Sequence, residues 1–318
     1  MGEALVRAGG GLEPPPAAAD ASEAVYARGV RYFTRWHEIM FGCAPVLPLA
    51  TQVVHAFVRD HLAGLEPDIA DILRAEKARK SPEKPSAVAT VRTWLTSLSV
   101  AQASAGYTEK VVTEPIKLLL RRHARIQAHW HRRARTRPVT EDILGKLLET
   151  CEEGTLADLR DRAMLLVGID SGGRRSSDLR DLRVENLERR GDDYLWVMPR
   201  SKTDAGTARD IYPITGRAAD ALGAWLGESG ITSGPVFRGL RGQRANKGPM
   251  GRSTLYDMLK RRARIAGLDE SLFSPHSLRY GFIAEASARG HSVFDIMRHT
   301  GHRTVGMVMH YANYQIHR

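Results

Sequence analysis

The segment SPHSLRYGF, residues 274–282, decides how the second half of the chain is interpreted. Ser274 is a residue type that caps helix N-termini and Pro275 suits the first helical position, so the segment predicts a helix that begins there. His276 then falls in the first turn, and Arg279 lies one turn later on the same face. A helix N-terminus beside a histidine and an arginine is suited to binding an anion. Taken alone, the segment is more typical of an ordinary capped helix with both side chains in water.

A second segment, GHSVFDIMRHTGHRTVGMVMHYANY at residues 290–314, predicts two short helices joined by a turn. Ser292 and Asp295 have the spacing of a capping box, and Gly301 is typical of the position that follows a helix end. His302 therefore lies on an exposed turn, where its ring can donate a hydrogen bond to a ligand. The pattern predicts a second group that could contact an anion.

Tyr311 lies two turns into the last of these helices, on the face shared with Met307 and Val308. An aromatic side chain at such a position is more often part of a hydrophobic core than a nucleophile. Its position alone therefore favours a core role.

Two more segments carry basic residues next to predicted structural boundaries. In IDSGGRRSSDLRDL, residues 169–182, paired glycines end one helix, and Arg175 stands at the start of the next with Asp178 close by. This arrangement favours an anion site, although an exposed ion pair between Arg175 and Asp178 fits the fragment equally well. Lys202 lies in PRSKTDAGTARDIYPI, between two candidate strands, near the tip of a predicted hairpin where most lysines only contact water.

Together the four segments resemble the tyrosine recombinase (phage integrase) family, and the resemblance covers nearly the whole chain. The family pattern Arg-x-Ser-Glu-Leu-x-x-Leu is similar to residues 175–182, with Asp178 in place of the usual glutamate. Arg174 is the neighbouring alternative, but it places the acidic residue one position late. Tyr311 follows His302 by nine residues, as in the family, and is therefore preferred to Tyr314. The resemblance implies a catalytic set of Arg175, Lys202, His276, Arg279, His302 and Tyr311, with Asp178 behind it.

The resemblance also implies a role for each of these residues. Tyr311 would attack a DNA phosphodiester to form a 3′-phosphotyrosyl intermediate, which stores the bond energy for rejoining without ATP. Arg175 and Arg279 would stabilise the charge that develops on the non-bridging oxygens. Lys202 would protonate the departing 5′ oxygen.

The remaining members of the set would assist around the phosphate. His276 would carry protons around the tyrosine and the phosphate, because its reference pKa is near neutrality. His302 would donate a hydrogen bond to a non-bridging oxygen, and Asp178 would orient the arginine or the histidine. We expect no cofactor and no metal: His299, His302 and His310 could in principle bind zinc, but no carboxylate or thiolate pattern accompanies them.

The charge balance agrees with a nucleic-acid partner. The 318 residues include 47 Lys and Arg against 36 Asp and Glu, a net charge of +11, which indicates a polyanionic partner. Only two cysteines occur, far apart, so a disulfide framework and a thiolate zinc site are both excluded and a reducing cytosol fits best. Neither a membrane span nor a signal peptide is indicated, and we expect the protein to remain in the cytoplasm.

The expected fold is mainly α-helical, with a small antiparallel β-sheet in the C-terminal domain. We expect a flexible arm at residues 1–21, a helical DNA-clamping (core-binding) bundle at 22–127 with a polar loop at 76–85, a basic linker at 128–139 and an α+β catalytic domain at 140–318. The arginines near the linker are candidate phosphate contacts, with a solvated charged face as the alternative. They are Arg121, Arg122, Arg125, Arg132, Arg133, Arg135 and Arg137.

The expected function is site-specific recombination of double-stranded DNA. The resemblance implies a homo-tetramer on two DNA sites, with accessory DNA-binding proteins as further partners and integration, excision or resolution as the biological task. Two alternatives remain open: a monomeric type IB topoisomerase-like enzyme that nicks and reseals DNA, and an accessory protein that binds DNA without cleaving it.

Overall fold

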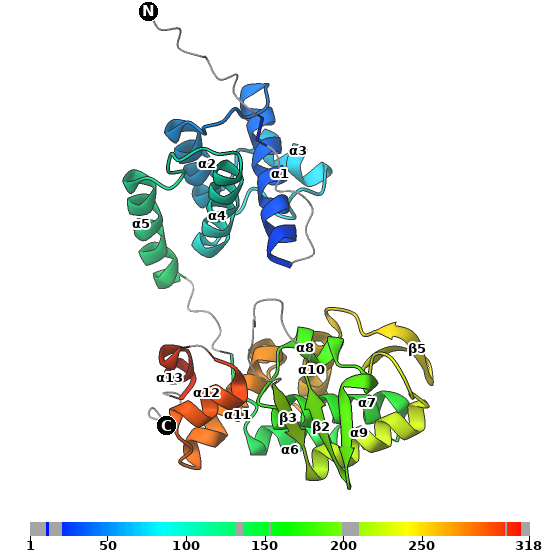
Figure 1. The fold of residues 1–318 in the computed structure, drawn as a ribbon. Helices are drawn as coiled ribbons and strands as arrows, with labels where there is room; N and C mark the ends of the chain where they lie inside the picture. The colour runs from blue at the N-terminus through cyan, green and yellow to red at the C-terminus, as the bar shows by residue number, and fades with distance from the viewer. Residues whose placement is uncertain are drawn as a thin grey trace, which may run out of the picture. The chain divides into compact units, whose positions relative to one another are not determined.

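A computed structural model of the protein describes residues 11–12, 21–130, 136–152, 154–198, 210–302 and 304–312, without the side chains of residues 21–22, 128–130 and 310–312. The chain forms two compact units, Met1–Arg132 (unit 1) and Arg133–Arg318 (unit 2), each with its own core (Figure 1). The division falls inside the stretch expected to be the linker.

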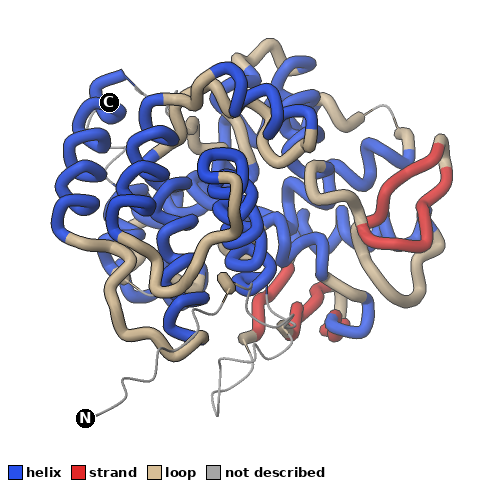
Figure 2. Tube along the Cα trace, turned by 90° about the horizontal axis from the view of Figure 1, so that it is seen from above, coloured by secondary structure: helices blue, strands red, loops and turns tan. Residues whose placement is uncertain are grey.

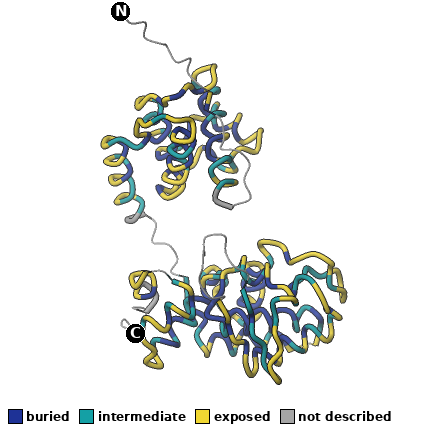
Figure 3. Tube along the Cα trace, in the orientation of Figure 1, coloured by how far each residue is buried: buried dark blue, intermediate teal, exposed yellow. Residues whose placement is uncertain are grey.

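Unit 1 is a helical bundle. Its elements are α1 (Ala21–Phe41), α2 (Thr51–Ala63), α3 (Pro67–Ala75), α4 (Val88–Ser104) and α5 (Glu114–Trp130). Residues 76–85 form a loop, as expected, whereas the short helix α3 was not foreseen. The residues coloured as buried lie in the interior of the bundle (Figure 3). Phe33, Trp36 and Phe57 are fully enclosed.

The expected arm is wrong at the two residues before α1 that the structure describes. Gly11 pairs with Val46 in an isolated antiparallel bridge, and Leu12 is buried in the core of unit 1. Burial removes the apolar Leu12 side chain from water, and the free energy gained favours this ordered position over a flexible one. The other residues of the expected arm before Ala21 lie outside the described residues.

A buried histidine lies at the centre of this aromatic core. The Tyr32 hydroxyl lies 2.8 Å from Nε2 of His61, and Nδ1 of His61 lies 2.7 Å from the Phe57 carbonyl oxygen. Since a carbonyl can only accept, Nδ1 carries the proton and Nε2 accepts from Tyr32. Burial lowers the pKa of His61 to about 3, so the ring is neutral at physiological pH.

The buried neutral ring makes the stability of unit 1 depend on pH. Unfolded His61 takes up a proton near its ordinary pKa of 6.5, whereas folded His61 does so only near 3. The free energy of unfolding therefore has its full value, as far as His61 is concerned, above pH 6.5. As the pH drops from 6.5 towards 3, this group lowers it by about 1 kcal/mol per pH unit. The free energy of unfolding, measured with urea between pH 7 and 4.5, should depend less steeply on pH in His61→Gln, which keeps a donor and an acceptor. Equal slopes in the two proteins would contradict this prediction.

Unit 2 combines helices with two small sheets. Its helices are α6 (Glu141–Glu149), α7 (Leu156–Asp170), α8 (Ser176–Asp181), α9 (Gly216–Ser229), α10 (Thr254–Ile265), α11 (Pro275–Ala288), α12 (Val293–Thr300) and α13 (Val305–Ala312), with 3-10 turns at Val184–Asn186 and Glu270–Leu272. Its strands are β1 (Leu187–Arg190), β2 (Asp193–Val197), β3 (Ile211–Ile214), β4 (Arg238–Arg241) and β5 (Arg244–Pro249). The helices expected to begin after Arg175, Ser274 and Ser292 begin there.

Both sheets are antiparallel. Strands β1, β2 and β3 pair in that order, with Tyr194 opposite Ile214 and Val197 opposite Ile211, while β4 and β5 form a separate hairpin (Figure 2). The two candidate strands on either side of Lys202 are therefore present and pair with each other. Strands β1, β4 and β5 were not foreseen.

Helix α7 is the central helix of unit 2 and packs against α9 and α11. Its apolar run from Ala163 to Val167 is almost completely buried. The same helix buries Asp161, which accepts hydrogen bonds from Arg160 and from Arg262 of α10. This packed helix provides a fixed support for the turn that follows it.

The last residues of the expected linker belong to unit 2. The amide of Arg137 donates to the Leu272 carbonyl at 2.8 Å, and the amide of Val139 donates to the Ser277 carbonyl at 2.9 Å. A Cβ on Gly281 would lie 2.0 Å from the carbonyl oxygen of Val139, so the two backbones touch directly. The expected linker is also too long at its other end, because α5 continues to Trp130.

Candidate active site

The turn after α7 brings the chain against α11. Gly172 and Gly173 both have positive φ, at +87° and +64°, which few other residues adopt. A Cβ on Gly173 would lie 2.1 Å from the Cα atom of Arg279. Only glycine therefore allows the turn that leads to Arg175 to rest on α11 at Arg279.

Arg174 and Arg175 follow this turn with opposite exposure. Arg174 is only 5% exposed, whereas Arg175 is exposed at the start of α8. The Arg175 amide donates to the Asp178 carboxylate at 3.2 Å, which caps α8. Asp178 thus holds the backbone of Arg175, while the Arg175 guanidinium remains accessible to a ligand.

Arg279 joins three parts of unit 2 although it is only 6% exposed. Its Nη1 donates to the Gly173 carbonyl at 3.2 Å, its Nη2 to the Thr300 carbonyl at 2.7 Å, and its Nε to Nε2 of His302 at 3.1 Å. These bonds hold the turn before α8 next to the turn after α12. His276 is exposed in the first turn of α11, one turn before Arg279.

His302 lies on the turn that Gly301 opens with a positive φ of +71°. The Thr300 hydroxyl donates to the Ile296 carbonyl at 2.7 Å and lies 2.7 Å from Nδ1 of His302. The Arg279 guanidinium faces the same ring, with its Nε 3.1 Å from Nε2 and its Nη2 3.2 Å from Nδ1. Burial, together with the charges of Arg279, Arg175 and Arg174, lowers the pKa of His302 to about 4. The imidazole is neutral in the DNA-free protein, and a bound phosphate anion would favour its protonated, donating form.

The structure therefore brings together three residues of the predicted catalytic set, Arg175, Arg279 and His302, with His276 one turn away. Lys202 belongs to the connection between β2 and β3 and lies outside the described residues. Tyr311 lies in α13, but its side chain is outside the described part of the structure.

The arginines predicted to contact DNA divide into three groups. Arg121, Arg122 and Arg125 are exposed on α5, and Arg137 is half-buried on unit 2. Arg132, Arg133 and Arg135 lie outside the described residues.

A layer behind the catalytic set was not foreseen from the sequence. The Arg174 guanidinium lies 4.0 Å from the centroid of the Tyr212 ring, and the His299 ring stacks on Phe282 at 4.9 Å. Nε2 of His299 lies 3.1 Å from the Asp170 carbonyl oxygen. The only sequence signal for these contacts was the pair of adjacent arginines, Arg174 and Arg175.

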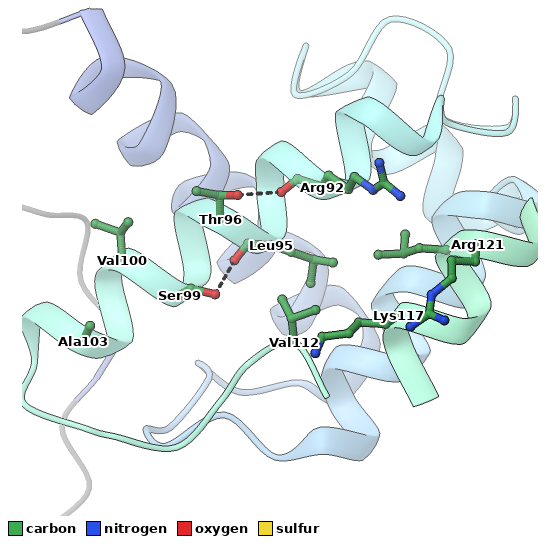
Figure 4. A pocket seen from close by; sticks show the side chains of 10 residues that line it. Arg92, Leu95, Thr96, Ser99, Val100, Ala103, Val112, Lys117 and Arg121 are labelled. Carbon is green, nitrogen blue, oxygen red and sulfur yellow. Dashed lines mark hydrogen bonds between the residues drawn. The ribbon is translucent and has the colours of Figure 1, made fainter. Parts of the chain in front are cut away.

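Unit 1 carries a groove between α4 and α5 with a volume of about 560 Å³ (Figure 4). Three cations line it, Arg92, Lys117 and Arg121, and Arg121 alone was predicted. Glu114 pairs with Lys117 at 2.6 Å and with Arg121 at 3.6 Å. The remaining lining residues are apolar or carry hydroxyl groups: Leu95, Thr96, Ser99, Val100, Ala103, Val112 and Leu120.

Among the residues that the structure describes, no three metal-binding side chains converge on one point. None of the helices in the described ranges combines the length and the apolar character needed to cross a membrane.

Residues 137–318 match the model of the phage integrase family. Because this match covers more than half of the chain, the protein belongs to the phage integrase family. The resemblance inferred from the four sequence segments is therefore confirmed.

Two curated proteins give the scale of the similarity. The chain is 32% identical over 181 residues to the integrase/recombinase XerD homolog of Selenomonas ruminantium, covering 55% of this chain and 53% of that protein. It is 33% identical over 170 residues to the tyrosine recombinase XerC of Chromohalobacter salexigens, covering 51% and 52%. The chain spans about half the length of these curated relatives.

Two solved structures share the fold across both units. The Tn1549 transposon integrase in complex with transposon right end DNA has a TM-score of 0.60 at 14% identity, covering 93% of this chain and 90% of that chain. The XerH site-specific recombinase bound to its difH substrate has a TM-score of 0.59 at 15% identity, covering 92% and 77%. The expected fold class, mainly α with small antiparallel sheets, is confirmed.

Proposed function

We propose that the protein is a site-specific tyrosine recombinase that cleaves and rejoins duplex DNA through a 3′-phosphotyrosyl intermediate, in the integration, excision or resolution of a mobile element. The observation that carries this proposal is the meeting of Arg175, Arg279 and His302, which come from three distant segments. Membership of the phage integrase family supports the same reaction.

The arrangement suits the charge that develops during attack on a phosphodiester. Arg175 is exposed and carries its charge towards solvent, while Arg279 is held rigidly by two backbone carbonyl groups. Fixed guanidinium donors stabilise an oxyanion without reorganising during the reaction. His302 becomes a third donor once the phosphate raises its pKa.

In the proposed step the Tyr311 oxygen bonds to the phosphorus while the bond from phosphorus to the 5′ oxygen breaks. Lys202 gives a proton to that 5′ oxygen, and His276 accepts the phenolic proton. A 5′ hydroxyl of the same or another strand then attacks the phosphotyrosine and reverses the exchange. One phosphodiester replaces another, so no external energy source enters the balance.

Covalent trapping tests this proposal directly. The chain is incubated with a pool of nicked duplexes of varied sequence, in which the short cleaved fragment diffuses away, and the trapped peptide is identified by mass spectrometry. We expect a nucleotide on the peptide that contains Tyr311 and a free 5′ hydroxyl on the released fragment. Retention of DNA without a covalent bond would overturn the proposal in favour of an accessory protein.

Particle stoichiometry separates recombination from the topoisomerase-like alternative. Recombination through a homo-tetramer predicts particles that contain four chains and two duplexes. Particles of one chain on one duplex, together with nicking and resealing of DNA, would instead support the monomeric type IB topoisomerase-like alternative.

The groove of unit 1 is proposed as part of the DNA contact, with Arg92 and Lys117 binding backbone phosphates. Arg92→Gln combined with Lys117→Gln should weaken DNA binding and reduce the slope of log K against log salt by roughly 2, since each phosphate contact contributes about 0.9. Lys77→Gln combined with Lys80→Gln removes the same charge from the loop before α4 and is the matched control. Equal slopes for the two double variants would exclude the groove as a DNA contact.

A further inference from the structure

We propose that Arg174 is a positioning residue, which holds the β2–β3 hairpin and the His302 turn in place around Arg175 without touching DNA itself. This inference rests on the proposed strand-cleavage function and assigns a structural cause to the arrangement of the site.

The buried Arg174 side chain contacts segments that are far apart in the chain. Its Nη2 donates to the His299 carbonyl at 2.9 Å, in the last turn of α12. Its Nη1 lies 3.8 Å from the Met198 sulfur, directly after β2. Its guanidinium stacks 4.0 Å from the centroid of Tyr212 in β3.

Each contacted segment leads to a residue of the catalytic set. His299 is three residues before His302, on the same helix end. Met198 and Tyr212 lie on either side of the connection that contains Lys202. Arg174 itself precedes Arg175. One planar side chain therefore joins the segments that lead to Lys202, His302 and Arg175. Their proposed roles are general acid, hydrogen-bond donor to the phosphate and stabiliser of the developing charge.

The surroundings of Arg174 are unusual for a residue with a purely structural role. Within the part of the chain that the structure describes, no carboxylate forms an ion pair with Arg174, and its Nε has no hydrogen-bond partner. The face of the Tyr212 ring offers a cation–π contact, which compensates only part of the cost of burying a charge. Replacing such a buried charge by an apolar side chain of similar length is often neutral or stabilising. A stability role alone would favour methionine here.

Arg174 also adds to the positive potential at the site. It is one of the three guanidinium groups whose charges lower the pKa of His302. The other two, Arg175 and Arg279, are proposed to contact the phosphate directly. Arg174 adds its positive charge to the His302 region from a buried position.

Arg174→Met separates positioning from stability. We expect its single-turnover rate of covalent adduct formation at saturating DNA to fall at least tenfold, with the Kd for DNA within twofold of wild type and no loss of melting temperature. Arg174→Lys keeps the charge but loses the planar fork, and its rate should fall between those of wild type and Arg174→Met. A rate for Arg174→Met within twofold of wild type would overturn the inference, and a Lys variant equal to wild type would replace positioning by charge alone.

Arg160→Met is the matched control. Arg160 is also buried, at 7% exposure, and donates to the Arg238 carbonyl at 3.3 Å and to Asp161 at 2.9 Å. None of its hydrogen bonds within the described residues reaches Arg175, Arg279 or His302. We expect this variant to lower the melting temperature and to leave the rate unchanged well below it. A comparable rate loss in the control would show a general effect of disturbing the core and would overturn the inference.

A measurement on the DNA-free protein keeps this inference distinct from the proposed function. Amide hydrogen exchange at Gly301 and His302 should accelerate severalfold in Arg174→Met, and the pKa of His302 followed by NMR should rise from about 4. Unchanged exchange and an unchanged pKa would overturn the positioning role. If both change while wild type forms no adduct on any duplex, the proposed function fails and the positioning of the turn stands.

Discussion

Tyr311→Phe is expected to bind DNA with the affinity of wild type and to form no covalent adduct with a nicked duplex. The phenylalanine ring keeps the size and apolar contacts of tyrosine but has no oxygen to attack phosphorus. Loss of a nucleophile is expected to reduce the rate by roughly 10⁴-fold or more. Adduct formation is read by denaturing electrophoresis of labelled DNA, beside a binding measurement on the same variant.

Tyr314→Phe is the matched control for this prediction. It removes the same atom from the next tyrosine along the chain and should leave adduct formation unchanged. A normal adduct yield from Tyr311→Phe would remove Tyr311 from its proposed role. Loss of the adduct in Tyr314→Phe alone would assign the nucleophile to Tyr314.

Arg279→Ala is expected to reduce the cleavage rate by about 100- to 1,000-fold, the scale for losing one preorganised oxyanion donor. It should also destabilise unit 2, because the carbonyl groups of Gly173 and Thr300 lose the donor that they share. Leaving a buried acceptor without a partner costs about 1–3 kcal/mol. Cleavage is measured in single turnover at saturating DNA, and stability by urea unfolding.

Arg175→Ala is expected to lose cleavage activity as Arg279→Ala does, but without loss of stability. Its guanidinium is exposed, so the free energy of unfolding should stay within about 0.5 kcal/mol of wild type. The cleavage rate should nevertheless fall about as far as in Arg279→Ala, by roughly 100- to 1,000-fold. Full cleavage by Arg175→Ala would indicate that this arginine does not face the reacting phosphate.

Much of the fold follows from local sequence signals. The helix start at Ser274 and Pro275, the Ser292 cap and the Gly301 stop all form as these residues predict. Such signals depend on contacts within one helical turn, so a sequence contains all that is needed to recognise them.

The unforeseen elements depend on contacts between distant residues. Strands β1, β4 and β5 read LERR, RGLR and RANKGP, without the alternation of apolar and polar residues that indicates a strand. They form because a neighbouring strand supplies the hydrogen-bond partners. Leu12 likewise joins a core that helices later in the chain build.

The candidate site shows the same division. Four short segments taken together, through their resemblance to the family, were enough to propose Arg175, His276, Arg279 and His302 as site residues. The opposite burial of Arg174 and Arg175 could not be predicted, because it depends on Tyr212 and His299, which lie 38 and 125 residues further along the chain. Asp178 was expected to orient a side chain, and the structure has it capping the backbone of Arg175.

The close approach of Gly173 to Arg279 has a consequence for engineering. Where two main chains touch with no space for a methyl group, their separation does not depend on which side chains fill the surrounding interior. Libraries that vary the side chains in the core of unit 2 should therefore leave this separation unchanged. Diversification of the Gly172–Gly173 pair, in contrast, should return almost only the parental residues.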